Sequence, residues 1–387
     1  MTTLLFLLDR YPAFGGVETV TTVLANSLAE SYRVIICSQR GEEEHELLHR
    51  LSPGIIVRRL PQSSPKAVLT ALDSILTEQS VNIAIFQDSY ARNEFLAYHI
   101  AQRSDVKLIV AEHSAPSLSI RWLKTFRALP WWDLYHRLKL LYFNGRGHLH
   151  TMRRRSLLYR LCDRYIVLSE QLKQEFLRYS SVSETSKLSA IGNPVSYIPT
   201  DGVPLTKKKQ LLFIGQFVPL KGIDRLLRIW AKVQDTAEDW SLVLVGDGPQ
   251  MGEVKEHIST HRLKRVELEG FRPNVRDYCR KASILCLCSD FEGFPMVLPE
   301  AMCSGAVPVC FNSFASLADI ITDGEDGCSI PAFDEEAYAS KLLQLMQDET
   351  QLRHMAEAAC AKSAEFNLGA VSERWQTLFE ELLSAAM

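Results

Sequence analysis

The sequence lacks the marks of several common protein classes. No run approaches the roughly 18 uninterrupted apolar residues that a membrane-spanning helix needs. No CxxC pair or Cys/His cluster has the spacing of a zinc site, and nine cysteines are an odd number for a disulfide framework. The Gly-x-Gly-x-x-Gly fingerprint of dinucleotide-binding proteins is also missing. A net charge of −3 argues against a protein whose whole surface neutralises nucleic-acid phosphates.

The apolar N-terminus, residues 1–8, lacks basic residues and stops at Asp9, so we interpret it as a first strand rather than a signal peptide. Cys286 and Cys288 lie two residues apart in an apolar run, and we expect both thiols to be buried on one face of a strand. Unpaired cysteines are typical of a reducing compartment. The sequence therefore favours a cytoplasmic protein.

The small net charge hides an asymmetry along the chain. Residues 1–190 carry a net charge of +6 and residues 191–387 a net charge of −9. The positive excess comes from residues 113–180, which alone carry +9. The two halves are thus chemically different.

Alternating apolar runs and amphipathic segments predict an α/β fold of two Rossmann-like, doubly wound domains facing a central cleft. We expect the first domain at residues 1–195, with a basic aromatic insertion at 114–160. A polar, Pro/Gly-marked stretch at 199–209 indicates the boundary, and the second domain should span 205–368. Residues 369–387 should form a helix that packs back towards the first domain. The expected strands are 4–8, 33–37, 55–58, 82–86, 107–110 and 165–168, followed by 211–214, 242–245, 266–268, 284–287 and 307–310.

Two glycine turns follow expected strands. Gly15 and Gly16 precede the first helix, where a phosphate can approach the backbone and meet free N–H groups, although a turn required only for packing is the alternative. The Gly246-Asp-Gly248 turn is equally consistent with approach to a nucleotide and with an ordinary strand-end turn.

The most informative stretch is residues 289–305, which contains two glutamates separated by seven residues. Pro295 places Glu292 on a loop and Glu300 about one turn into the following helix. The backbone N–H groups at the start of that helix should be free to bind an anion. Two carboxylates beside such a site favour a ligand that presents hydroxyls as well as phosphate. The alternative is a surface loop with a glutamate that favours the helix dipole.

Lys221 follows the first strand of the second domain and can neutralise a phosphate, although a solvated loop lysine is the commoner case. Four elements occur in chain order: Lys221-Gly222, Gly246-Asp-Gly-Pro249, the Glu292 to Glu300 element, and Asp326-Gly327. With them, the chain resembles the retaining glycosyltransferases of family 4, which have the two-domain GT-B fold. The resemblance covers essentially the whole length.

The resemblance implies roles for individual residues. Glu292 would bind hydroxyls of the donor sugar, Lys221 would neutralise the leaving diphosphate, and His113 would lie near the transferred sugar; these three form the implied catalytic set. Glu300 would bind the ribose, and Gly16 would let its loop close on the phosphates. The full implied donor-binding set is Gly16, Gln216, Gly246, Gly293, Phe294, Pro295, Met296, Val297 and Glu300.

Gln216 departs from the family pattern, which usually has an arginine five residues before the lysine. Glutamine can donate hydrogen bonds to phosphate but carries no charge. Removing one electrostatic donor from a transition state costs roughly 2–4 kcal/mol by analogy. Three explanations stay open: another cation compensates, the enzyme is slow, or the chain is a non-catalytic partner subunit.

The basic segment also contains many aromatic residues, a combination that suits a lipid headgroup interface. We expect an acceptor and membrane face here, although an ordinary helical excursion with a solvated basic face is the alternative. The residues proposed for this face are Arg121, Trp122, Lys124, Trp131, Trp132, Arg153, Arg154 and Arg155.

Together with these patterns, the resemblance implies a retaining glycosyltransferase that moves a sugar from a nucleoside-diphosphate sugar to a lipid-linked glycan acceptor, in lipopolysaccharide or capsule biosynthesis. The expected location is peripheral, on the inner face of the cytoplasmic membrane. No cofactor, metal ion or nucleic acid is expected; no Asp-x-Asp pair lies in a plausible metal loop. A sugar-nucleotide epimerase on a similar fold is the rival enzyme.

Overall fold

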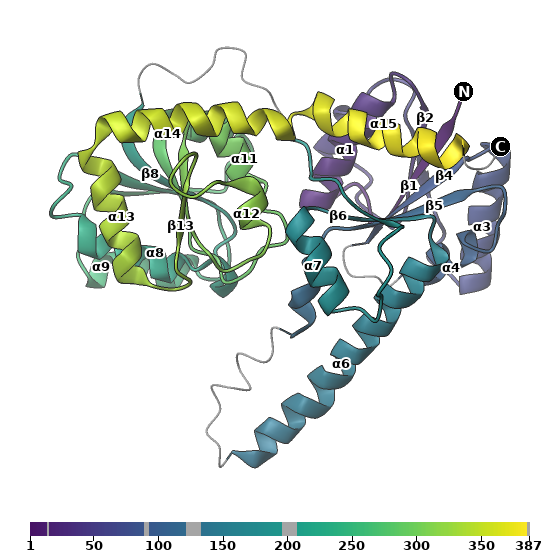
Figure 1. Ribbon diagram of the computed structural model, residues 1–387, viewed down its shortest axis with the longest axis horizontal. Coiled ribbons are helices and arrows are strands. Elements are labelled where there is room, and N and C mark those ends of the chain that lie inside the picture. The colour runs from purple at the N-terminus through teal and green to yellow at the C-terminus, as the bar shows by residue number, and fades with distance from the viewer. Residues whose placement is uncertain (14, 89–92, 121–132, 196–206, 385–387) are drawn as a thin grey trace. The chain divides into compact units, whose positions relative to one another are not determined.

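The computed structural model describes the chain except for residues 14, 89–92, 121–132, 196–206 and 385–387. The chain divides into two compact units (Figure 1). Unit 1 comprises Met1–Pro194 and Val371–Met387, and unit 2 comprises Val195–Ala370. Each unit is described by itself below.

Unit 1 is built on a seven-stranded sheet with the order β3-β2-β1-β4-β5-β6-β7, and every neighbouring pair is parallel. Its strands are β1 (Thr3–Arg10), β2 (Arg33–Arg40), β3 (Ile56–Arg59), β4 (Ile83–Asp88), β5 (Lys107–Glu112), β6 (Arg164–Val167) and β7 (Leu188–Ala190). Its helices are α1 (Gly16–Leu28), α2 (Glu46–His49), α3 (Pro65–Glu78), α4 (Glu94–Ile100), α6 (Leu134–Leu161) and α7 (Glu170–Arg178), with a short 3-10 turn η1 (Pro116–Ile120).

Unit 2 repeats this plan with a six-stranded parallel sheet of order β10-β9-β8-β11-β12-β13. Its strands are β8 (Lys208–Ile214), β9 (Ser241–Val245), β10 (Val266–Gly270), β11 (Ala282–Leu287), β12 (Val307–Phe311) and β13 (Cys328–Ile330). Its helices are α8 (Ile223–Val233), α9 (Met251–Thr260), α10 (Arg276–Lys281), α11 (Val297–Met302), α12 (Leu317–Ile320), α13 (Glu335–Gln347) and α14 (Glu349–Lys362), with the 3-10 turns η2 (Pro219–Lys221) and η3 (Ser363–Phe366).

The apolar runs form strands because a parallel sheet covered by helices is buried on both faces. Every side chain from Leu4 to Leu7 in β1 is fully buried, and all six residues of β11 are buried. The expected doubly wound α/β fold is confirmed, and all eleven expected strands are present. The short strands β7 and β13 were not predicted, because three-residue runs carry too little periodicity to be recognised.

Helix α15 (Leu368–Ser384) contributes to the core of unit 1, although most of unit 2 precedes it in the sequence. Trp375 and Phe379 belong to the same buried cluster as Leu4 and Phe6 of β1. The ring of Phe379 meets the ring of Tyr32 edge-on, with centroids 5.5 Å apart. The C-terminal segment is therefore part of the unit that contains the N-terminus.

The cysteines follow the expectation for small apolar side chains. Eight of the nine are buried, Cys360 is partly exposed, and all nine are free thiols. Cys286 and Cys288 are 1% and 0% exposed, and burial raises the pKa of Cys286 to about 12. At neutral pH this thiol is protonated and unreactive, so it serves packing.

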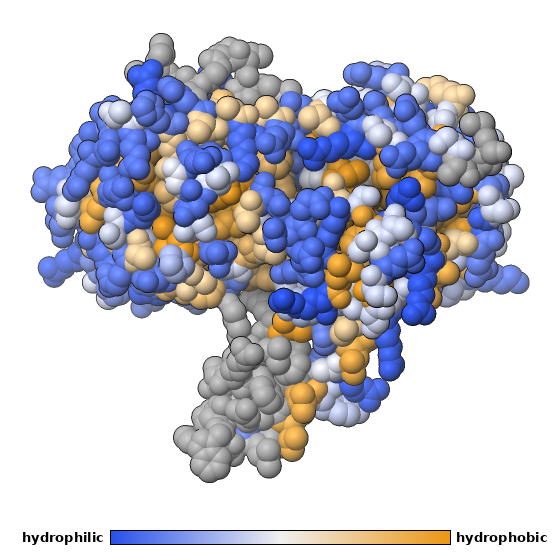
Figure 2. All heavy atoms as spheres, in the orientation of Figure 1, coloured by the Kyte–Doolittle hydropathy of each residue, from blue (hydrophilic) through white to orange (hydrophobic). Residues whose placement is uncertain are grey.

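Helix α6 is the longest helix of the part described, at 28 residues, and its first half projects away from the sheet of unit 1 (Figure 1). It contains seven Lys/Arg residues and no acidic residue. Leu138, Tyr142 and Leu149 are more than half exposed and share one face of the helix by their spacing. Hydrophobic side chains are visible along this projection in Figure 2. No helix within the described ranges is long and apolar enough to cross a bilayer.

Candidate active site

The order of the strands selects one place in unit 2 for a ligand. Chain order reverses between β8 and β11, and in doubly wound sheets ligands bind beyond the carboxyl ends of the strands at such a point. The loop after β8 ends in η2 with Lys221, and the loop after β11 carries Glu292. Because β8 and β11 are paired neighbours, these two loops lie side by side.

Lys221 and Glu292 form an ion pair at this point. The distance from Lys221 Nζ to Glu292 Oε1 is 2.7 Å, and the two side chains are 27% and 11% exposed. The buried Ser289 hydroxyl donates a second hydrogen bond to the same carboxylate oxygen, at 2.6 Å. Within the part of the chain that is described, Oε2 of Glu292 accepts no hydrogen bond. It is therefore available to a ligand hydroxyl.

Three loops hold this pair in place. The backbone N–H of Asp290 donates to Leu220 O at 2.8 Å, which joins the loop after β11 to the loop after β8. From the loop after β12, Ser313 Oγ donates to Ser289 O and Ser316 Oγ donates to Gly293 O, both at 2.6 Å. The glutamate loop is thus fixed from both sides before any ligand binds.

Two glycines allow these loops to approach one another. Gly222, with φ 63°, ends η2 in the left-handed conformation, and a Cβ there would lie 2.2 Å from Cys288 O. A Cβ on Gly246 would lie 1.9 Å from Gly215 O. The glycine of the Gly246-Asp-Gly248 turn is therefore required by loop packing, whatever role it has towards a nucleotide.

Helix α11 begins at Val297, so Glu300 lies one turn into it, as expected. At the start of this helix, the backbone N–H of Leu298 donates a hydrogen bond to Pro295 O at 3.0 Å. Phe294 is 8% exposed, and its ring packs edge-on against the ring of Phe366. Any contact of Phe294 with a ligand would therefore use its backbone.

Within the described part of unit 2, Arg225 is one cation that could replace the missing arginine at position 216, but it is bound elsewhere. Gln216 is exposed. The nearby cation Arg225 donates to Cys288 O at 2.7 Å and pairs with Asp290 at 3.0 Å. It also lies against the ring of Phe333. The guanidinium of Arg225 therefore stabilises the loop that carries Glu292.

The equivalent edge of unit 1 carries Gly16 and His113. Chain order reverses there between β1 and β4; Gly16 lies in the segment after β1, and His113 directly follows β5. A Cβ on Gly16 would meet no atom of the described residues within 4 Å, so packing against them does not require a glycine here. His113 Nε2 is hydrogen-bonded to the side-chain oxygen of Gln87, at the end of β4. Its Nδ1 is buried without a partner among the described residues.

A buried ionic cluster lies immediately before His113. Arg155 of α6 donates to Glu112 Oε1 from Nε at 2.8 Å and from Nη2 at 2.6 Å, and the two side chains are 3% and 2% exposed. Tyr165 donates to Glu112 Oε2 at 2.9 Å, and Arg155 also donates to Pro116 O at 3.0 Å. This cluster attaches α6 to β5.

These contacts correct part of the expected membrane face. Arg155 cannot contribute to such a face because its guanidinium is buried against Glu112. Arg154 is mostly buried as well, since it pairs with Glu94 of α4. Arg153 is exposed. The other proposed members, Arg121, Trp122, Lys124, Trp131 and Trp132, lie outside the described residues.

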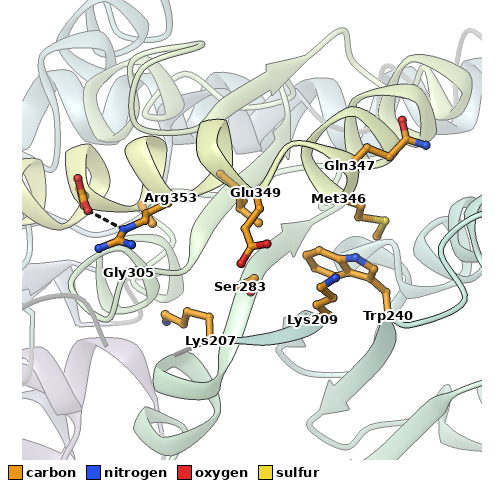
Figure 3. A pocket seen from close by; sticks show the side chains of 12 residues that line it. Lys207, Lys209, Trp240, Ser283, Gly305, Met346, Gln347, Glu349 and Arg353 are labelled. Carbon is orange, nitrogen blue, oxygen red and sulfur yellow. Dashed lines mark hydrogen bonds and ion pairs between the residues drawn. The ribbon is translucent and has the colours of Figure 1, made fainter. Parts of the chain in front are cut away.

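Unit 2 also has a cavity of about 240 Å³ at the opposite edge of its sheet (Figure 3). Lys209 and Ser283 line it near the amino ends of β8 and β11. Its cations have partners in the protein: Lys207 donates to Cys279 O and Ser304 O, Lys209 pairs with Asp239, and Arg353 pairs with Glu357. The cavity is therefore separate from the candidate site. No group of three or more potential metal ligands occurs among the residues described.

Several residues of the site were not found from the sequence. Ser289 could have been suspected, because it lies three residues before Glu292. Gln87, Ser313 and Ser316 carry no such signal, since single polar residues at strand ends are common. Arg155 was assigned to the surface because it lies in a basic run, and a sequence does not show which arginine of such a run is buried.

Two units of this kind, each a parallel sheet with surrounding helices, are the architecture of the GT-B class of glycosyltransferase fold. The solved structure of HepE of Anabaena in complex with UDP shares this fold, with a TM-score of 0.74, 15% identity, and coverage of 98% of this chain and 100% of that one. The family model described as Glycosyltransferase Family 4 matches residues 14–197, and the model for Glycosyl transferases group 1 matches residues 200–362. The chain belongs to this glycosyltransferase family.

Two named relatives are similar to this chain in sequence. An alpha-1,4-N-acetyl-D-galactosaminyltransferase of Campylobacter jejuni is 25% identical over 96% of this chain and 96% of its own length. Its name specifies an acceptor linked to diNAcBac-PP-undecaprenol. An exopolysaccharide phosphotransferase of Streptomyces coelicolor is 34% identical over 57% of this chain, but the match spans only 24% of that protein.

Proposed function

We propose that this protein is a retaining, metal-independent glycosyltransferase that transfers a sugar from a nucleoside-diphosphate sugar to a glycan acceptor. The observation that carries the proposal is the Lys221–Glu292 pair at the switch point of unit 2, supported by Ser289. One unbonded carboxylate oxygen beside one ammonium group suits a ligand that presents hydroxyls and phosphate together. A nucleotide sugar has both.

The proposed chemistry needs no protein nucleophile. The bond between the anomeric carbon and the diphosphate oxygen breaks, and the acceptor oxygen attacks that carbon from the same face. The proton of the acceptor hydroxyl passes to the leaving phosphate oxygen. Lys221 compensates the charge that develops on the diphosphate, while Oε2 of Glu292 accepts a hydroxyl of the transferred sugar and orients it.

A donor panel tests this proposal. The full chain is mixed with UDP-glucose, UDP-N-acetylgalactosamine, GDP-mannose, ADP-glucose and dTDP-rhamnose, and its melting temperature is measured. We expect one nucleotide class to raise the melting temperature and its sugar to be hydrolysed slowly without acceptor. An epimerised donor would support the rival enzyme, and stabilisation by none of the five would contradict donor binding.

We also propose that the acceptor is lipid-linked, that the protein works in cell-surface polysaccharide biosynthesis, and that it docks on anionic lipid at the inner face of the cytoplasmic membrane. The support is α6, where Leu138, Tyr142 and Leu149 are exposed in a helix with seven basic and no acidic residues. Pairing α6 with a second copy of itself would bring like charges together. An anionic surface both neutralises the charge and covers the apolar side chains.

Vesicle flotation tests this docking. We expect binding to vesicles containing phosphatidylglycerol at low salt, weaker binding at high salt, and none to pure phosphatidylcholine. Leu138→Asp with Leu149→Asp should reduce binding about tenfold or more, because two charges would have to be desolvated. Phe271→Asp in unit 2, where Phe271 is 63% exposed, is the control. Equal binding by both proteins would exclude α6 as the docking element.

A further inference from the structure

Gln87 and His113 are brought together by strand pairing. In the parallel pair β4–β5, Gln87 is in register with Ala111 and Asp88 with Glu112, so His113 follows just beyond the paired ends. Gln87 is 4% exposed. Its buried side chain therefore reaches the imidazole of the neighbouring strand rather than water.

The polarity of this contact determines the state of the ring. His113 Nε2 meets the side-chain oxygen of Gln87, and an amide oxygen can only accept a hydrogen bond. With Gln87 in this orientation, Nε2 carries the hydrogen. In a neutral imidazole the other nitrogen, Nδ1, is then an acceptor. Burial lowers the pKa of His113 to about 4, so the ring is neutral at physiological pH.

Nδ1 is buried, and the described part of the chain supplies it with no donor. The carboxylate of Glu112, the preceding residue, cannot supply a hydrogen and is engaged with Arg155 of α6. A buried acceptor without a partner is costly, by roughly 1–3 kcal/mol. Such an atom is expected where a ligand supplies the missing donor.

We propose that Gln87 is a positioning residue for His113: its side-chain oxygen fixes the ring as the Nε2–H tautomer, so that Nδ1 meets the substrate as an acceptor for a sugar hydroxyl. The identity of the ligand, a sugar, rests on the proposed function. The tautomer of His113 does not, because it follows from the contact with Gln87. His113 then orients a hydroxyl and neither donates a proton nor carries positive charge during the reaction.

The first test needs no donor. Nitrogen-15 NMR of the full chain labelled in its histidines distinguishes the two neutral tautomers, and the His113 signals are assigned by their loss in His113→Asn. We expect the Nε2–H tautomer from pH 6 to pH 8, roughly two units or more above the pKa. In Gln87→Leu both tautomers should be populated. An Nδ1–H tautomer in the unaltered protein would overturn the proposal even if the enzyme is an active transferase.

The second test uses pH. In Gln87→Glu a carboxylate faces the ring and favours the imidazolium, in which Nδ1 is protonated and can no longer accept. The acidic limb of kcat/KM should move upward by about one pH unit or more, measured by hydrolysis of UDP-glucose, UDP-N-acetylgalactosamine or GDP-mannose, whichever is turned over. Gln87→Leu should keep the original limb and lose about tenfold in kcat, by analogy with the partners of metal-bound histidines.

Gln79→Glu is the matched control. Gln79 also accepts a hydrogen bond in unit 1, from Arg33 at 2.6 Å, and it lies just after α3, away from the strand ends that carry His113. This variant should leave both the tautomer and the pH profile unchanged. If Gln87→Glu folds normally by circular dichroism and its profile coincides with that of the control, Gln87 does not position His113. Comparing hydrolysis with transfer to an acceptor shows whether the hydroxyl belongs to the donor or to the acceptor.

Discussion

The two units share a strand order but differ in how the side chains beyond the carboxyl ends of their strands are paired. In unit 2 the charged groups of the site are already paired: Lys221 meets Glu292, and Ser289 and the loop after β12 hold the carboxylate in place. In unit 1 the edge carries open space at Gly16 and an unpartnered nitrogen on His113. The charged groups of the first edge are paired with each other before a ligand binds, whereas the second edge has a buried neutral nitrogen without a partner among the described residues.

This difference indicates a division of labour. A donor's diphosphate is a strong and constant anion, so a rigid edge with fixed charges suits it. Unit 1 places its buried charges elsewhere, in the Glu112–Arg155–Tyr165 cluster that holds α6 against β5. There the protein uses electrostatics to position a whole helix. Charge at the candidate site of unit 2 and charge in the buried cluster of unit 1 can therefore be tested separately.

The largest expected effect is on the stability of unit 1. Arg155→Met would remove the cation that pairs with Glu112, whose side chain is 2% exposed, and breaking a buried ion pair costs about 3–5 kcal/mol. We expect a fall in melting temperature of roughly 10 °C. Arg153→Met, two positions away on the exposed side of α6, should change stability by less than about 0.5 kcal/mol. Equal melting temperatures for the two variants would show that the cluster does not hold α6.

The next effect is on catalysis in unit 2. Glu292→Gln keeps the size of the side chain but removes the charge that pairs with Lys221, and Lys221→Met removes the other partner. Each should lower kcat/KM about 100-fold or more, the usual cost of removing one preorganised electrostatic group. Glu253→Gln on α9, where Glu253 is exposed and accepts from Gln250, should have little effect. Unchanged rates in the first two variants would move the catalytic site elsewhere.

The fold could be predicted largely from the sequence, because β strands buried on both faces read as short apolar runs separated by amphipathic helices. The positions of Glu292 and Lys221 on loops beyond strand ends were predicted, because a proline, a helix start and a strand end restrict where each can lie. Their contact with each other was not predicted, since it depends on β8 and β11 being neighbours, which is a property of the sheet. The Gln87–His113 pair depends in the same way on β4 and β5.

The error at Arg155 has the same origin. Residues 153–155 are three arginines in a row, and a helix turns each of them by about 100°, so one can face solvent while another faces the sheet. The sequence shows the run of positive charge but not the position of Glu112, 43 residues earlier, that neutralises one member. Burial of charge is decided by partners that only the tertiary structure brings together.

The smallest effect concerns Gln216, and it tests whether the rigid edge of unit 2 has adapted to a missing charge. Gln216 is exposed, and Arg225 is already bound to Cys288 O and Asp290, so an arginine at position 216 would be an additional cation. Replacing a neutral donor by a charged one adds about 1 kcal/mol to a phosphate contact, which corresponds to roughly a fivefold rise in kcat/KM for the donor. Gln347→Arg adds the same charge to unit 2 beside the cavity at the opposite sheet edge and should leave the rate unchanged. A fall in rate for Gln216→Arg alone would mean that the site depends on a neutral group there, and that the charge of Lys221 is sufficient.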